Sequence, residues 1–158
     1  MITYVKRDLL DSNCDFICHQ VNCQGVMNSG IAKQIREKWP EVYTQYLKKY
    51  VNADGYSDKL LGEIQHVPVS NLKTVINMFA QENYGYDGHR YTSYDAFWNC
   101  LNLIKQTVPK GKTIGFPKKI GCDRGGANWP VILEMITEVL GVEYKVFIYY
   151  LEGDDGTY

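Results

Sequence analysis

The sequence predicts an α/β protein with a central, largely parallel or mixed sheet of about six strands, folded as a single domain over residues 1–158. Short apolar segments alternate along the chain with longer segments in which apolar residues recur every three to four positions. The central strand segments are apolar throughout, which is typical of strands covered by helices on both faces. The length of 158 residues fits one domain, since domains hold roughly 100–200 residues.

The first half of the chain contains four expected strands and one long helical segment. A glycine-containing loop over residues 22–30 leads into the helix, which begins near Ile31. Pro40 restarts this helix midway, because proline lacks the backbone N–H that a helix interior needs. Strands are expected at residues 2–6, 15–21, 62–69 and 74–81.

The second half continues the alternation of strands and helices. Thr92 and Asp95 are placed as a capping pair for the first helix of this half. Asn128 and Pro130 open the second helix and Gly141 ends it. A polar loop is expected at residues 82–92, helices at 93–107 and 128–141, strands at 112–116 and 144–151, and a glycine-rich loop at 120–126.

Charge and hydropathy exclude several classes of protein. Seventeen Lys plus Arg against eighteen Asp plus Glu give a formal net charge of −1. Broad electrostatic binding of nucleic acid is therefore disfavoured, while a local basic patch stays open. The longest apolar runs fall far short of the ~20 residues of a membrane span, and the first residues lack a signal-peptide pattern. We expect a cytoplasmic protein that does not enter membranes.

The five cysteines do not predict a disulfide scaffold or a metal site. Their odd number argues against a secreted disulfide framework. Cys18 and His19 are adjacent in an expected strand, so their side chains point to opposite faces and one ion would not reach both. We expect neither a metal ion nor a cofactor.

Two glycine-rich loops are the candidate ligand site. They cover residues 22–31 and 118–128, each between an expected strand and an expected helix. Ligands of such sheets bind outside the carboxyl ends of the strands, and successive backbone N–H groups at helix N-termini bind anions. The pair predicts a diphosphate site, although glycines also serve ordinary turns. Neither loop matches a Walker A or a dinucleotide-binding fingerprint, which disfavours ATPases and classical dehydrogenases.

These loops resemble those of the macro domain (Appr-1-p processing) family. Residues 17–35 resemble the family's first ligand loop and residues 116–129 the second. Residues 77–85 and 90–95 are similar to bacterial and phage macro domains, and residues 5–10 occupy the place of the family's Gly-Asp-Ile segment. The likeness covers essentially the whole chain. It is greatest to the branch with terminal ADP-ribose protein glycohydrolase and the yeast ADP-ribose phosphate phosphatase.

The resemblance implies a three-layer α/β/α domain that binds ADP-ribose. Asp8 would accept the adenine amino group beside the Leu9 backbone, and Tyr149 would border the adenine. The two loops would hold the diphosphate and the distal ribose, with Asn22 near that ribose. The implied ligand-binding residues are Asp8, Leu9, Asn22, Met27, Asn28, Ser29, Gly30, Ile31, Gly121, Cys122, Asp123, Arg124, Gly125, Gly126 and Tyr149.

Each key residue also has a purely structural interpretation. Asp8 stands where it would cap a short helical turn, and Tyr149 lies in an apolar strand where it would be a core residue. Asn22 fits a turn that ends a strand. Asp123 fits an exposed loop residue without chemistry, and His19 a core histidine.

The second loop supplies the candidate catalytic carboxylate. The resemblance to terminal ADP-ribose protein glycohydrolase implies a lysine nucleophile and an Asp that act on the distal ribose. In this chain Gln81 is nearest to the lysine's place, and Gly125 stands at the position of the Asp. We therefore expect Asp123 as the catalytic carboxylate and Asn22 as the residue that orients the ribose or the water. The ligand's own diphosphate is an alternative base.

Three functions follow from these features. The first is an ADP-ribose-processing hydrolase that acts on an ADP-ribosyl ester or on a phosphate of the distal ribose. The second is a non-catalytic reader of free ADP-ribose or of ADP-ribosylated protein. The third, disfavoured by the net charge, is a single-stranded nucleic-acid or other nucleotide-binding module that uses the aromatic loop from Tyr84 to Tyr94 beside His89 and Arg90.

Overall fold

The computed structural model describes residues 2–151 and 153, and these contain a six-stranded mixed sheet of order β1-β6-β5-β2-β4-β3. Neighbouring strands are parallel except β3, which pairs antiparallel with β4 at one edge. The predicted mixed sheet is confirmed. The strands are β1 (Ile2–Lys6), β2 (Phe16–Asn22), β3 (Ile64–Ser70), β4 (Lys73–Gln81), β5 (Thr113–Pro117) and β6 (Lys145–Tyr150).

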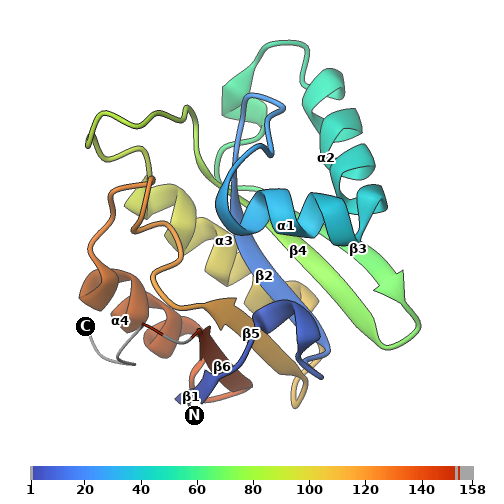
Figure 1. Ribbon diagram of the computed structural model, residues 1–158, viewed down its shortest axis with the longest axis vertical. Helices are drawn as coiled ribbons and strands as arrows, with labels where there is room; N and C mark the ends of the chain where they lie inside the picture. The colour runs from blue at the N-terminus through green and yellow to red at the C-terminus, as the bar shows by residue number, and fades with distance from the viewer. Residues whose placement is uncertain (1, 152, 154–158) are drawn as a thin grey trace.

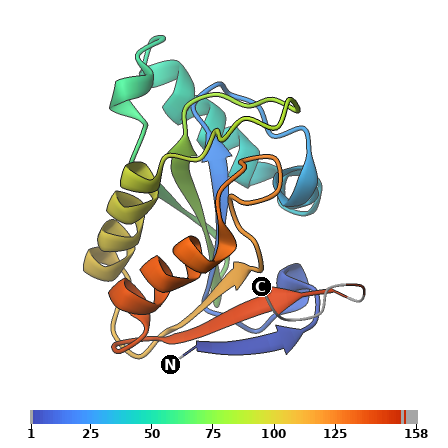
Figure 2. The same ribbon diagram turned by 90° about the vertical axis from the view of Figure 1, so that its left-hand side faces the viewer.

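Helices cover both faces of the sheet, so the predicted three layers are confirmed (Figures 1 and 2). Two helices lie on each side, one pair before β3 in the chain and the other pair after β4. Short 3-10 turns, η1 and η2, follow β1 and α2. The helices are α1 (Gly30–Lys38), α2 (Pro40–Asn52), α3 (Tyr94–Thr107) and α4 (Trp129–Leu140), with η1 (Leu9–Asp11) and η2 (Ser57–Lys59).

Strand β4 shows why the central strands are apolar throughout. Ile76, Met78 and Ala80 belong to the buried cluster under α3 and α4. Val75 and Phe79 alternate with them and belong to the cluster under α1 and α2. Because successive side chains of a strand point to opposite faces, a strand between two helical layers needs apolar residues at nearly every position.

The helix ends follow the sequence signals with one exception. Trp39 separates α1 from α2, and Asn128 caps α4 by accepting a hydrogen bond from Val131 N at 3.3 Å. The predicted Thr92 capping pair is wrong. Ser93 caps α3 by accepting from Ala96 N at 3.1 Å, since the helix begins one residue later than the pattern suggested.

His19 is a core histidine, one of the interpretations that the sequence offered. Its ring is fully buried, and Nε2 lies 2.5 Å from Oδ1 of Asn77 on the neighbouring strand β4. Asn77 in turn donates to Oε1 of Gln65 at 3.0 Å. Burial lowers the pKa of His19 to about 4, because the interior disfavours the charged imidazolium. The histidine is therefore neutral at physiological pH.

The described residues contain neither a metal-binding cluster nor a membrane-spanning helix. Within residues 2–151 and 153, no three His, Cys, Asp or Glu side chains gather as metal ligands would. None of the helices in the same part of the chain has the length and apolar character needed to cross a membrane.

Candidate functional site

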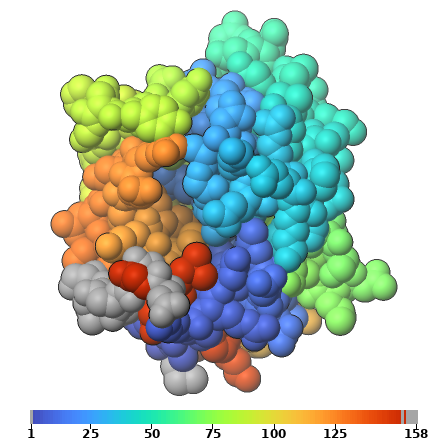
Figure 3. Space-filling view, viewed as in Figure 1, coloured from blue at the N-terminus to red at the C-terminus, as the bar shows by residue number. Residues whose placement is uncertain are grey.

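A cavity of about 360 Å³ opens at the carboxyl ends of β2, β4 and β5. Figure 3 shows the hollow between the orange residues that follow β5 and the blue residues that lead into α1. Loops that are distant in sequence form its walls, as expected for a sheet of this type. The predicted site residues that line it are Asn22, Met27, Asn28, Ser29, Gly30, Ile31, Gly121, Asp123, Arg124 and Gly125.

The first wall is the loop after β2, and Asn22 shapes it. Asn22 is 8% exposed; its Nδ2 donates to Val26 O at 2.9 Å and its Oδ1 accepts from Gln24 N at 3.0 Å. The hydroxyl of Tyr46, buried on α2, lies 2.7 Å from the same Oδ1 and accepts from Val26 N at 3.1 Å. The Asn22 amide thus holds the loop in shape, as its interpretation as a turn residue predicted; its catalytic role stays a prediction.

The N-terminus of α1 faces the cavity, where its first backbone N–H groups can bind an anion. Ser29 stands at the N-cap, but its side chain makes no capping hydrogen bond, so the first amide groups of the helix lack a side-chain acceptor. Gly30, Ile31 and Ala32 line the cavity. Gly30 has φ of +59°, and a Cβ there would meet no atom within 4 Å. The backbone is thus open to close approach by a phosphate, which such helix ends favour.

The second wall is the loop after β5, which is fastened to the loop after β4. The carbonyl of Gly125 accepts from the amides of Tyr91 and Thr92 at 2.8 and 2.9 Å. Oγ1 of Thr92 donates to Gly121 O at 2.7 Å. A Cβ on Gly125 would collide with Gly121 O and Thr92 Oγ1. The glycine at position 125 is therefore required by the close approach of protein backbone, whatever ligand the cavity takes.

The third wall comes from the loop after β4, whose lining residues were not among the implied ligand-binding residues. Tyr84, Gly85 and Tyr86 line the cavity; the tyrosine cluster was the available signal, and it was interpreted as a separate nucleic-acid surface. Gln20 and Gln81 also line it, with Gln20 Nε2 donating to Gln81 Oε1 at 2.7 Å. No sequence signal marked Gln20, because an amide in an apolar strand has no characteristic pattern.

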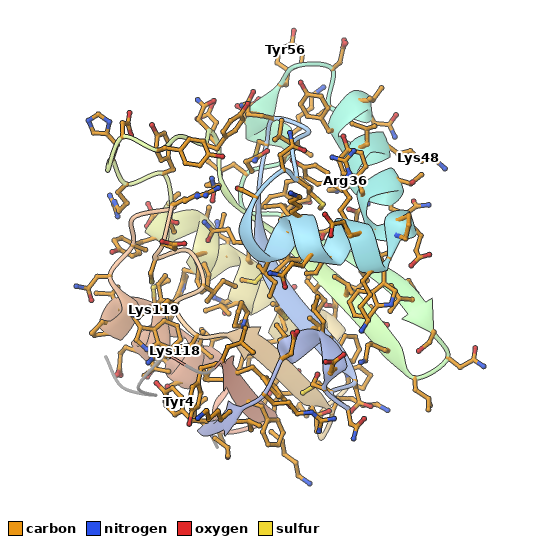
Figure 4. The ribbon with its side chains drawn as sticks, viewed as in Figure 1. Tyr4, Arg36, Lys48, Tyr56, Lys118 and Lys119 are labelled. Atoms are coloured by element: carbon orange, nitrogen blue, oxygen red, sulfur yellow. The ribbon has the colours of Figure 1, made fainter. Side chains whose placement is uncertain are left out.

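Asp123 is the carboxylate of the cavity. It is exposed and lines the wall formed by the loop after β5. The charged lining residues are Lys118, Lys119, Asp123 and Arg124. This excess of cations contrasts with the chain's net charge of −1 and suits an anionic ligand. Figure 4 labels Lys118 and Lys119 on the side of the molecule where Figure 1 labels α4.

Five predicted site residues do not line the cavity as it stands. Asp8 accepts from Leu10 N at 3.0 Å and caps η1, which is the structural interpretation it was given. Leu9 and Tyr149 belong to a small buried cluster, and Tyr149 is 9% exposed. Burial raises the pKa of Tyr149 to about 12, because the interior disfavours a phenolate. The other two residues, Cys122 and Gly126, are also outside the lining.

The fold and the cavity together define a class of protein. It is a three-layer α/β/α ligand-binding domain, with an uncapped helix N-terminus and two glycine loops around one cleft. The chain belongs to the macro domain family, whose sequence profile, described as Macro domain, matches residues 18–136.

Curated relatives match parts of the chain. It is 22% identical over 151 residues to "DNA ADP-ribosyl glycohydrolase" of Thermus aquaticus, covering 93% of this chain and 41% of that protein. The protein of the same name from Mycobacterium tuberculosis is 46% identical over 48 residues, covering 30% and 14%. "ADP-ribose 1''-phosphate phosphatase" of Scheffersomyces stipitis is 42% identical over 52 residues, covering 29% and 30%. The chain thus spans less than half of the length of each of these relatives.

Solved structures share the whole fold. A protein of unknown function from Bacteroides thetaiotaomicron has a TM-score of 0.82 and 28% identity, covering 94% of this chain and 97% of that chain. The macrodomain of Mycobacterium tuberculosis DarG has a TM-score of 0.77 and 23% identity with the same coverage. Thermosipho africanus DarTG in complex with ADP-ribose has a TM-score of 0.77 and 18% identity, covering 96% and 42%.

The Tyr46 hydroxyl gives a first testable prediction about the site. Tyr46→Phe removes the group that accepts from Val26 N and contacts Asn22, leaving buried polar atoms unpaired. We expect the free energy of unfolding to fall by about 1–3 kcal/mol, measured by urea denaturation. Tyr50→Phe is the control, since the Tyr50 ring packs on Gly25 and keeps that contact. Equal losses in both variants would contradict the role of the Tyr46 hydroxyl.

Proposed function

We propose that this domain binds ADP-ribose in the 360 Å³ cavity and hydrolyses a bond at its distal ribose. The observation that carries the proposal is the meeting of the uncapped α1 N-terminus, two glycine loops and the Asp123 carboxylate at one cavity. The names of the relatives support it, because they describe removal of ADP-ribose or of phosphate from ADP-ribose. The solved complexes of similar folds with ADP-ribose support the ligand.

The order of the strands gives the ligand a direction. Asp8 follows β1 and Tyr149 lies on β6, at one side of the sheet. With the adenine there, the diphosphate would meet the N-terminus of α1 and the loop after β5. The distal ribose would then lie toward β4, near Gln81 and Asp123. In this position Asp8 would use the carboxylate oxygen that does not cap η1.

Asp123 would serve as the general base. Cleavage at a ribose anomeric carbon passes through an oxocarbenium-like state, and a carboxylate within reach of water removes a proton as the water attacks. The new bond joins the water oxygen to the anomeric carbon, the bond to the attached group breaks, and the leaving atom takes up a proton. The attached group would be DNA, a protein carboxylate or phosphate, by likeness to the relatives and to the family.

A non-catalytic reader is the second candidate, and one observation favours it. Gln81 occupies the end of β4, where it accepts from Gln20 and donates to Asn83 O at 2.8 Å. An amide held in this way is not a nucleophile. The lysine-dependent chemistry of the family's relatives therefore has no counterpart at Gln81.

A thermal unfolding scan with millimolar ADP-ribose tests the binding site. Ligand at about a hundred times its dissociation constant should add roughly 2.7 kcal/mol, or on the order of 5–10 °C for a domain of this size. ADP and guanosine diphosphate are the controls. A rise with ADP-ribose that exceeds both controls supports the site; no rise would overturn the proposed function.

A further inference from the structure

Two exposed tyrosines stand at the end of the cavity where the distal ribose would lie. Tyr84 is 48% exposed and Tyr86 is 69% exposed, and both line the cavity. They lie on the loop after β4, beyond Gln81. Exposed aromatic rings at a ligand site are available for stacking, because their faces are not fully packed against the rest of the protein.

Arg124 joins the two walls at this point. Its guanidinium lies 4.3 Å from the centroid of the Tyr86 ring, and Nη1 donates to the Tyr86 hydroxyl at 3.2 Å. A cation over an aromatic face is attractive, so this contact holds Tyr86 against the loop after β5. One face of the ring carries the guanidinium while most of the side chain remains exposed.

The loop that carries the tyrosines is well fastened. The Tyr91 hydroxyl donates to Asp87 Oδ1 at 2.8 Å, and His89 Nδ1 lies 2.9 Å from Asp87 Oδ2. The Tyr91 and Thr92 amides donate to Gly125 O. We call Tyr84 and Tyr86 the platform. Because the loop that carries it is held at its base and at its tip, the platform loses less conformational entropy when a ligand stacks on it.

The position of the platform decides what it can touch. The adenine end of the ligand is assigned to the β1–β6 side of the sheet, and the platform follows β4 on the other side of β2. Figure 3 shows the yellow-green loop at one end of the hollow, with the end of β6, in red, toward the other. In the proposed orientation of the ligand, a group attached to the distal ribose would leave the cavity past Tyr84 and Tyr86.

We propose that Tyr84, Tyr86 and Arg124 form a subsite for the base of a single-stranded nucleic acid attached to the distal ribose. The inference rests on the proposed function. Successive bases stack on aromatic side chains, with cation–π support from Arg, and Lys118 and Lys119 add positive charge at the cavity. A peptide offers no comparable series of flat rings. The net charge of −1 does not oppose this, because the attached ADP-ribose supplies the main affinity.

Fluorescence anisotropy with four ligands tests the subsite. They are free ADP-ribose, a short single-stranded DNA carrying ADP-ribose on one base, the same DNA unmodified, and a peptide carrying ADP-ribose on Glu. Mass spectrometry at the end of each titration verifies that the ligand is intact. The attached strand is expected to tighten binding over free ADP-ribose by roughly 5- to 150-fold, the range that stacking of one base provides. The attached peptide is expected to add less than the strand.

Variants assign that gain to the platform. Tyr84→Ala with Tyr86→Ala should remove most of it, so the affinity for the attached strand should fall much more than the affinity for free ADP-ribose, and Tyr86→Phe should keep it. Tyr56→Ala is the matched control: Tyr56 is 58% exposed, has Lys59 Nζ 4.7 Å from its ring centroid, and lines a separate cavity. Figure 4 labels Tyr56 far from Lys118 and Lys119. Its loss should leave all affinities unchanged.

The outcomes separate the two proposals. If free ADP-ribose does not bind the parent protein, both the proposed function and the proposed subsite are overturned. If it binds, the subsite alone is overturned by any of three results: the strand adds less than about twofold, the gain survives the double variant, or the peptide gains as much as the strand.

Discussion

Asp123→Ala is expected to lower the rate of ADP-ribosyl or phosphate release by about 10²–10⁴-fold, the usual contribution of a general base. Asp123 is exposed at the cavity wall, so its loss should leave the fold and the ADP-ribose-induced rise in unfolding temperature almost unchanged. The measurement is product formation by chromatography, with ADP-ribosylated DNA, an ADP-ribosylated peptide and ADP-ribose 1''-phosphate as substrates.

Asp95→Ala provides the matched control for that loss. Asp95 is an exposed carboxylate in the first turn of α3 and lies outside the cavity lining, so turnover should remain at the parent level. Equal turnover in the two variants would remove Asp123 from the mechanism. A parent protein that binds ADP-ribose but releases nothing from any of the substrates would be a reader.

The second large effect is a loss of stability in mild acid that depends on His19. Its pKa is about 4 in the folded protein, against an ordinary value of 6.5 for histidine. The unfolded chain therefore takes up a proton first as the pH falls. The contribution of the neutral, buried His19 to stability is fully present above pH 6.5, and it is lost progressively as the pH falls to about 4. We expect a loss of about 2 kcal/mol between pH 7.5 and pH 5, measured by urea denaturation at each pH.

His19→Gln isolates this contribution. The variant should be less stable at pH 7.5, because it alters a buried hydrogen bond to Asn77, but its stability should change much less between pH 7.5 and pH 5. His66, whose pKa burial also lowers, contributes the remainder with the same sign. A parent-like slope in His19→Gln would contradict the assignment.

The strands and the two glycine loops were predictable from local patterns. Alternation of apolar segments placed all six strands within two residues of their observed limits. Gly30, with its positive φ, followed from the sequence because few other residues adopt that conformation. The Pro40 break between α1 and α2 was equally predictable, since it depends on the missing proline N–H.

The third wall of the cavity was not predictable in the same way. Tyr84 and Tyr86 belong to a polar loop, and sequence alone does not say over which neighbour such a loop folds. That depends on the hydrogen bonds from Tyr91 and Thr92 to Gly125, more than thirty residues away. Thr92 itself was assigned to a helix cap, a local interaction, whereas its hydroxyl donates to Gly121.

By itself the sequence determined the fold class, the family resemblance and the two loops that surround the cleft, because strand periodicity, glycine conformation and proline breaks act over a few residues. Only the tertiary structure decided that Asn22 and Tyr46 hold the first loop together and that Tyr86 meets Arg124. These contacts join segments whose distance in the sequence carries no signal. They form because strands β5, β2 and β4 lie side by side and end at the same edge of the sheet.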